Sequence, residues 1–209
     1  MDWQARRVAT RESLRAAVRH PAPRTRRWTR AEYDRLIALG ILDEDEPIEL
    51  LGGEMIVREP QGGPHATAVQ LVQQALQRAF GKGWTVRSQL PVALDAESEP
   101  EPDACVVRGG PRDYRAGHPT QAVLVVEVTI ESLLRDRARK GSLYARAGIG
   151  DYWIVNLREA VVEVYRQPVR SARSRHGWRY GVVERLDATG VISHLAAPRA
   201  RVRVADLLP

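Results

Sequence analysis

Cysteine is almost missing from this chain. Among 209 residues only Cys105 is a cysteine, which excludes an internal disulfide and a cysteine-rich zinc cluster. No stretch approaches eighteen consecutive apolar residues, and the first ten residues, MDWQARRVAT, contain no apolar segment of the secretory kind. The sequence therefore predicts no membrane span and no export signal, and we expect a protein of the reducing cytoplasm.

Phenylalanine and lysine are also scarce. Phe80 is the only phenylalanine, so the core must be built from Val, Leu, Ile, Ala and the five tryptophans. Lys82 and Lys140 are the only lysines, and arginine supplies most of the positive charge behind the net charge of +6. This excess suits a polyanionic partner such as nucleic acid, but a genome with arginine-biased codons would produce the same composition.

The N-terminal segment differs in composition from the rest of the chain. Residues 1–27 are basic and contain prolines, which predicts a flexible lead-in with a weak helix at residues 10–18. Its arginines could contact phosphate or form a solvated tail. We expect residues 28–209 to form a single domain, since they show no internal repeat.

The first predicted elements of that domain are a helix and a hairpin. Thr29 with Glu32 three residues later matches a capping box, so a helix should start there and run to about Leu39. In PIELLGGEMIV, two apolar runs flank Gly52-Gly53, which predicts a β-hairpin. The apolar spacing of residues 65–80 then predicts an amphipathic helix.

A sheet should follow. Strands are predicted at residues 84–94, 104–108 and 122–129, a helix at 133–147 and another strand at 151–156. Residues 161–166 should pair with that last strand, and residues 178–185 with a short end segment should form a C-terminal β extension. The order helix, three strands, helix, strand predicts an α/β (α+β) fold, with a mixed sheet flanked by helices.

Two acidic residues break the apolar pattern of the predicted strands. Asp103 opens one strand, and Glu127 lies inside the apolar run LVVEVT. A buried strand carboxylate is costly unless a metal or a basic side chain pairs with it. Lys140 follows on the next predicted helix, where Asp136 and Tyr144 share its face. The same spacing would equally describe an exposed salt bridge beside a packed aromatic ring.

Several stretches together resemble the Uma-two family of restriction endonuclease-like proteins, which belongs to the PD-(D/E)XK nuclease superfamily. They are IELLGGEM, GPHATAV, SEPEPDACVV, LVVEVTIESLLRDRARKGSLYARAGIGDYWIVN and VEVYR. The likeness extends over residues 28–168 and keeps the motifs in order. It implies a restriction-endonuclease-like core and a nuclease activity.

The resemblance also implies site residues. It identifies Asp103 as the PD aspartate and Glu127 as the acidic strand residue, which together would hold Mg²⁺ or Mn²⁺. The superfamily usually has a lysine two residues after that acid, where this chain has Thr129, and Lys140 matches the substitute lysine on the following helix. Three further positions match ones that the family tends to keep: Glu54, His65 and Gln89.

Three functions follow as hypotheses. The first is a metal-dependent endonuclease acting on nucleic acid, with DNA expected, and a homodimer would suit the cutting of two strands. The second is a nucleic-acid-binding or regulatory module without activity. Two departures from the family pattern favour it: Thr129 replaces the usual lysine, and Ile130 stands where the family often has an acidic or serine-proline element. The third is a hydrolase of a small phosphorylated molecule, which would need a narrow, closed pocket.

Overall fold

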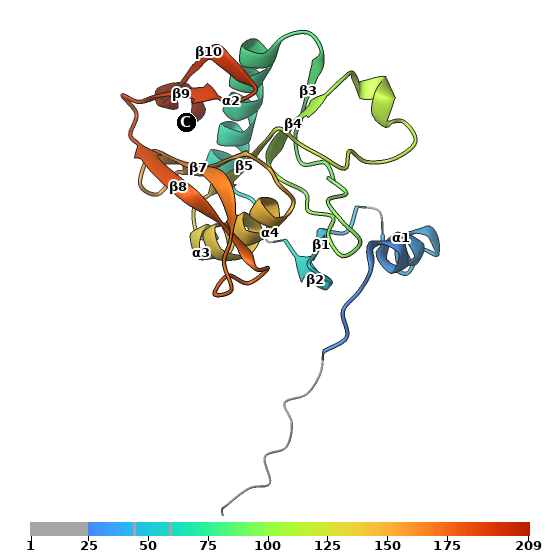
Figure 1. The fold of residues 1–209 in the computed structure, drawn as a ribbon. Helices are drawn as coiled ribbons and strands as arrows, with labels where there is room; N and C mark the ends of the chain where they lie inside the picture. Colours follow the sequence, from blue (N-terminus) through green and yellow to red (C-terminus); the bar gives the residue numbers. More distant parts are fainter. Residues whose placement is uncertain (1–24, 44, 59) are drawn as a thin grey trace, which may run out of the picture.

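The computed structural model describes residues 25–43, 45–58 and 60–209. The helix predicted at residues 10–18 and most of the lead-in at 1–27 lie outside this part of the chain. A six-stranded sheet forms the centre, with helices on both sides and two small hairpins at its margins (Figure 1). In the described part of the chain, no helix combines the length and apolar character needed to cross a membrane.

The central sheet is mixed, as the sequence predicts. Its order is β3-β4-β5-β6-β7-β8, with β5 and β6 parallel and every other pair antiparallel. The strands are β3 (Trp84–Arg87), β4 (Ala104–Arg108), β5 (Leu124–Thr129), β6 (Asp151–Asn156), β7 (Val161–Arg170) and β8 (Trp178–Leu186). The parallel pair requires a crossover connection, and the helical segment between β5 and β6 supplies it.

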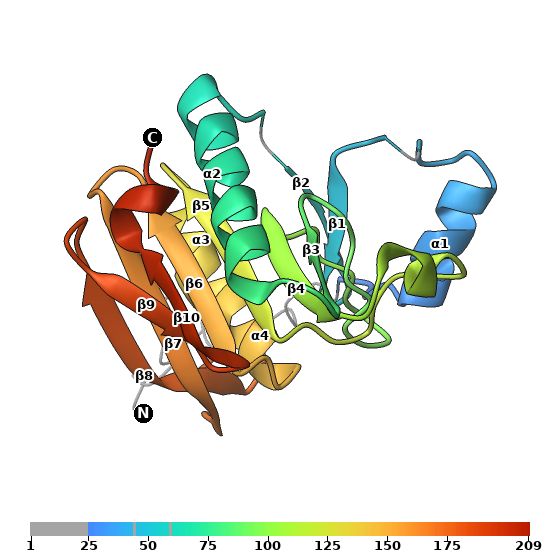
Figure 2. The ribbon, with the colours of Figure 1, turned by 90° about the horizontal axis from the view of Figure 1, so that it is seen from above.

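Side chains alternate between two apolar layers on the faces of the sheet. Helix α2 (Gly63–Phe80) packs on the face that carries Val106 and Val126, and α4 (Gly141–Arg146) packs on the face that carries Cys105 and Val125. Figure 2 shows α2 in front of the sheet and α4 behind it. The central strands β5 and β6 are covered on both faces and are mostly apolar. Each carries one buried acid, Glu127 and Asp151 respectively.

The predicted N-terminal elements are confirmed. Helix α1 (Arg30–Ala38) begins with the capping box of Thr29 and Glu32. Strands β1 (Ile48–Leu51) and β2 (Glu54–Val57) form the hairpin around the two glycines. Together α1 and the hairpin lie beside the edge of the sheet that carries β3.

The hairpin turn requires glycine. Gly52 has a φ of +58°, and a Cβ there would come within 2.5 Å of the His176 ring. We expect Gly52→Ala to lower the free energy of unfolding by about 1–3 kcal/mol, because it adds both backbone strain and a clash. Urea unfolding measures this loss. Gly117→Ala is the control, since a Cβ there meets nothing within 4 Å and should change stability by less than about 0.5 kcal/mol.

Two predicted elements were partly wrong. The strand expected at residues 84–94 ends at Arg87, because Gln89 adopts a φ of +52° and turns the chain away from the sheet. The helix expected at residues 133–147 is divided into α3 (Leu133–Arg135), the π-helical turn η2 (Asp136–Lys140) and α4. Two short 3₁₀ helices, η1 (Pro111–Tyr114) and η3 (Val204–Leu207), were not predicted.

The C-terminal extension is larger than the sequence predicts. After β8, strands β9 (Val191–His194) and β10 (Ala197–Arg203) form a separate hairpin that packs with η3 against α2. Its side chains Ile192 and Val202 join the apolar layer beneath α2. The hairpin therefore completes the cover of that face.

Within this hairpin, His194 predicts a dependence of stability on pH. It is 1% exposed, its Nε2 donates to the Val123 carbonyl at 3.1 Å, and its Nδ1 accepts from the Ala196 N–H at 2.9 Å. Because one ring nitrogen donates and the other accepts, these hydrogen bonds require the neutral form of the His194 ring. Burial lowers the pKa of His194, although Asp151 opposes the shift.

The unfolded chain binds this proton near the ordinary histidine pKa of about 6.5, while the folded chain excludes it. The contribution of His194 to stability is therefore fully present above that pH and is lost as the pH falls below it. We expect the Tm to drop between about pH 7.5 and pH 5.5, with a smaller drop for His194→Gln. Equal drops for both proteins would contradict this assignment.

Candidate active site

Asp103 and Glu127 meet because of the register between β4 and β5. Ala104 pairs with Val126 in this antiparallel pair, so the next residues outward along the two strands are Asp103 and Glu127. Directly opposite residues in such a pair have their Cβ atoms roughly 5 Å apart on the same face. Both acids are buried, at 5% and 4% exposure.

A pocket of about 250 Å³ opens beside these two acids. It is lined by six acidic residues, three basic residues and several neutral ones. The acidic ones are Glu49, Glu101, Asp103, Glu127, Glu131 and Asp136, and the basic ones are Arg58, Arg135 and Lys140. Besides the imidazole of His65, only Lys140 is a buried base of this lining, against four buried acids, so the interior of the pocket has a surplus of acidic side chains.

The Asp103 carboxylate is held by three donors. Oδ2 accepts the Val128 N–H at 2.8 Å and lies 3.2 Å from His65 Nε2, which also donates to the Val128 carbonyl at 2.9 Å. Oδ1 accepts only a long bond of 3.3 Å from the Gln61 amide. One Asp103 oxygen is therefore fixed by the protein, and the other is weakly engaged at the pocket.

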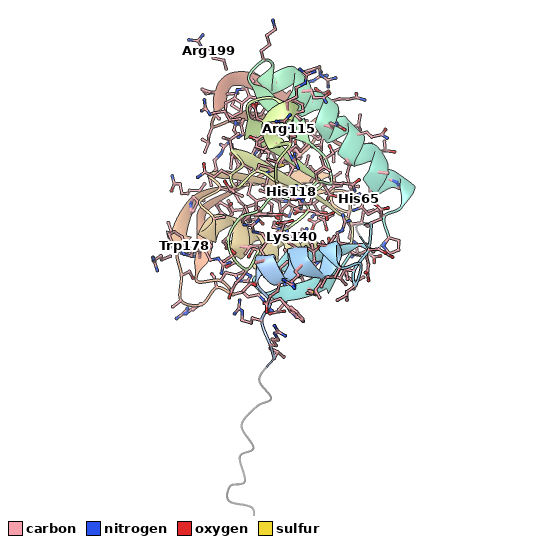
Figure 3. The ribbon with its side chains drawn as sticks, turned by 90° about the vertical axis from the view of Figure 1, so that its right-hand side faces the viewer. His65, Arg115, His118, Lys140, Trp178 and Arg199 are labelled. Carbon is pink, nitrogen blue, oxygen red and sulfur yellow. The ribbon has the colours of Figure 1, made fainter. Side chains whose placement is uncertain are left out.

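His65 stands at the start of α2, where Gly62 and Gly63 bring the helix up to the sheet. Contact with Asp103 and the Val128 carbonyl outweighs burial and raises the pKa of His65. Its Nδ1 is buried, and no described residue offers it a hydrogen bond. Figure 3 shows His65 beside the α2 ribbon and Lys140 nearer the middle of the molecule.

Glu127 forms a buried cluster with a base and a phenol. Its Oε1 accepts from Lys140 Nζ at 3.1 Å and from the Tyr144 hydroxyl at 2.6 Å. Lys140 Nζ also lies 3.2 Å from Glu49 Oε2, so one ammonium serves two carboxylates. Burial raises the pKa of Glu127 to about 8; Lys140 opposes this shift and Asp103 adds to it.

The π-helical turn brings both Asp136 and Lys140 into the pocket. Asp136 is 3% exposed and accepts from the Ser132 hydroxyl at 2.6 Å, and that hydroxyl lies 2.9 Å from Thr129 Oγ1. Burial raises the pKa of Asp136, while Lys140 opposes the shift. Thr129 stands where the sequence resemblance implies a lysine in related nucleases. Here its hydroxyl and that of Ser132 form a chain of hydrogen bonds that orients Asp136. Ile130 is 36% exposed and lines the pocket.

The structure does not place every expected residue at the pocket. Glu54 lies outside the pocket lining and is bound by Arg139 at 2.8 Å and by Arg175 at 2.8 and 3.0 Å. Gln89 is exposed and reaches the pocket only through a 2.7 Å bond to Gln61. Asp103, Glu127, Lys140 and His65 all line the pocket.

Sequence reasoning missed Glu49 and Glu101 as pocket residues. Glu49 is 2% exposed within the fully buried strand β1, so it is a strand acid of the same kind as Glu127, and that signal was available in the run IELL. Glu101 lies beside it, and its N–H donates to Glu49 Oε2 at 3.2 Å. Glu101 lies in the loop between β3 and β4. Only the folded structure brings the β1–β2 hairpin next to that loop, so spacing along the sequence does not predict the contact.

The acidic side chains at the pocket offer oxygen atoms, the ligand type that a hard divalent cation such as magnesium takes. Within residues 25–43, 45–58 and 60–209, no set of three or more His, Cys, Asp or Glu side chains is arranged to enclose a metal. Magnesium usually keeps several waters and takes one or two carboxylates together with substrate phosphates. Asp103 and Glu127 offer this oxygen-only set, with one weakly engaged oxygen on Asp103.

A family model described as Uma2, putative restriction endonuclease, matches residues 30–189. The chain belongs to the Uma2 family. The resemblance predicted from the sequence is therefore confirmed, and the matched region contains the whole candidate pocket. No curated protein matches the chain.

A solved structure supports the Uma2 fold. It is the 1.96 Å crystal structure of a putative nuclease belonging to DUF820 from Anabaena variabilis ATCC 29413. The likeness has a TM-score of 0.60, covers 82% of this chain and 96% of that chain, and has 16% sequence identity. At this identity the likeness concerns the fold, and it confirms the predicted nuclease-like α/β architecture.

Proposed function

We propose that this Uma2 protein is a divalent-metal-dependent endonuclease that hydrolyses phosphodiester bonds in nucleic acid, with DNA as the expected substrate. One observation carries the proposal: Asp103 and Glu127 are cross-strand neighbours at a pocket with a surplus of acidic side chains. Burying repelling carboxylates is costly. Their common position is explained if a cation and a phosphate complete the site.

Each residue has a defined part in this proposal. Asp103 and Glu127 would hold Mg²⁺ or Mn²⁺, which when bound polarises a phosphoryl oxygen and lowers the pKa of water. Lys140, held between Glu127 and Glu49, presents an ammonium to the charge that develops on the phosphate. His65 fixes the orientation of Asp103 through Oδ2 and leaves Oδ1 directed to the pocket.

The direct test is cleavage by the purified protein. Labelled duplex DNA, single-stranded DNA and RNA are each incubated with Mg²⁺, with Mn²⁺ or with EDTA. We expect cleavage of at least one nucleic acid with either metal and none in EDTA. Intact substrates under every condition, with a protein whose circular dichroism shows it to be folded, would refute the proposal.

A second candidate is a nucleic-acid-binding module without cleavage. The observation that favours it is the closed pairing of Glu127 Oε1 with both Lys140 and Tyr144, which satisfies that oxygen without a metal. This alternative predicts salt-sensitive binding that Asp103→Asn leaves unchanged and that does not respond to Mg²⁺.

A further inference from the structure

A second pocket lies on the α4 side of the sheet, with a volume of about 610 Å³. The π-helical turn, α4 and the β7–β8 connection line it, and we call it the arginine pocket. Its basic residues are Arg137, Arg173, Arg175 and Arg179, its aromatic residues are Tyr165, Trp178 and Tyr180, and none of its lining residues is acidic. It is therefore opposite in charge to the candidate active site.

Two of these arginines lack a carboxylate partner among the residues that the structure describes. Arg137 pairs with Glu163, and Arg175 pairs with Glu54. For Arg173 and Arg179, both exposed, no ion pair is formed with any residue of the described part of the chain. A cavity that keeps unpaired guanidinium groups beside aromatic rings is suited to phosphate and to a flat base.

The wall of the arginine pocket is anchored to the helix behind it. The buried Ser142 donates to the Trp178 carbonyl at 2.7 Å and accepts the His176 N–H at 3.0 Å. The Trp178 ring is half-buried, and the Arg170 guanidinium lies over it, 5.1 Å from the ring centroid. Trp178 is thus held at the pocket by its backbone, by the apolar layer on the α4 side of the sheet and by Arg170.

The two pockets are neighbours across the π-helical turn. Asp136 and Lys140 line the candidate active site, while Arg137 and Ala138, between them in sequence, line the arginine pocket. Figure 3 shows Lys140 between Trp178 on one side and His65 on the other. A chain bound at one pocket would reach the other after a short span along the backbone.

We propose that the arginine pocket holds an unpaired stretch of the nucleic-acid strand that continues from the phosphate at Asp103 and Glu127. This inference rests on the proposed function. Arg173 and Arg179 would contact backbone phosphates, and Trp178 would stack on a base. The strand must be unpaired because a ring that lines a concave cavity can stack only on a base that has left its duplex.

The test is binding in EDTA, which separates affinity from cleavage. Fluorescence anisotropy with a labelled single-stranded oligonucleotide compares the parent with the double variant Arg173→Gln/Arg179→Gln. We expect roughly tenfold weaker binding, and a slope of log K against log salt that is smaller by about 1.4, for two lost contacts to a single strand. Both arginines are exposed, so the variant should stay folded.

The matched control is Arg199→Gln/Arg201→Gln. It removes the same charge from β10, on the α2 side of the sheet, and should change affinity less than about twofold. An equal loss in both double variants, or none in the first, overturns the inference. The inference is also overturned if an unlabelled acidic peptide competes as well as the oligonucleotide. It is overturned too if Arg173→Gln/Arg179→Gln loses the same affinity for a fully paired duplex.

A photocrosslink tests the stacking directly. An oligonucleotide containing 5-iodouracil should crosslink to Trp178 in the parent, and adducts found only on other residues would overturn the stacking role. Failure of cleavage with intact EDTA binding would remove the endonuclease proposal alone. Unchanged binding in Arg173→Gln/Arg179→Gln would remove the arginine pocket alone.

Discussion

Asp103→Asn and Glu127→Gln should each reduce metal-dependent cleavage roughly a thousandfold or more, since each removes a charge that holds the cation. Stability should respond differently. The pKa of Glu127 is raised by burial and nearby carboxylates, so keeping its carboxylate charged costs the fold free energy, and Gln still accepts from Lys140 and Tyr144. We expect the Tm of Glu127→Gln to equal or exceed that of the parent, because residues selected for activity are often less stabilising than their neutral substitutes.

The matched control is Asp151→Asn, another buried strand carboxylate outside the pocket. Asp151 is 0% exposed and is bound by Arg166 at 3.0 Å and by the Trp153 ring N–H at 2.8 Å. Asp151→Asn should lower the free energy of unfolding by about 2–4 kcal/mol, while the protein that remains folded should cleave at the rate of the parent. A Glu127→Gln variant that loses stability like Asp151→Asn, or that still cleaves, would contradict the assignment.

Lys140→Met should destabilise the fold by about 3–5 kcal/mol, because it leaves Glu49 and Glu127 buried without a cation. The two carboxylates would then repel each other in a site that excludes most water. Urea unfolding measures the loss of unfolding free energy in Lys140→Met. The double variant Lys140→Met/Glu127→Gln should recover about half of that loss, since one uncompensated charge disappears.

Lys82→Met is the control for this prediction, because Lys82 is the other lysine of the chain and lies exposed in the turn before β3. Its stability should differ from the parent by less than about 0.5 kcal/mol. If Lys140→Met proves as stable as Lys82→Met, Lys140 does not neutralise the buried acids, and its part in the site is lost as well.

The acids on central strands were predictable because a carboxylate inside an apolar run needs a partner. That reasoning found Asp103 and Glu127, and their convergence then followed from antiparallel pairing. It would have found Glu49 too, but the run IELL was interpreted only as one arm of a hairpin. Since β1 is buried along its whole length, Glu49 needs a buried partner as Glu127 does, and Lys140 pairs with both.

Other features depend on contacts that local spacing does not encode. Residues 133–147 have ordinary helical periodicity, yet Gly141, where a Cβ would come within 3.2 Å of the Asp136 carbonyl, lets the chain widen into a π turn. Such turns often mark functional sites. Glu54 is withdrawn from the pocket partly by Arg175, which lies 121 residues later in the chain. No sequence pattern near Glu54 predicts that pairing.

The most direct measurement is a crystal structure of the protein soaked in Mn²⁺, with the ion located by its anomalous signal. Coordination by Asp103 Oδ1 and Glu127 is the predicted result, at roughly 2.0–2.3 Å from each, with water on the pocket side. An ion bound elsewhere, or no anomalous peak at this pocket while the protein cleaves nucleic acid, would contradict the two-carboxylate site.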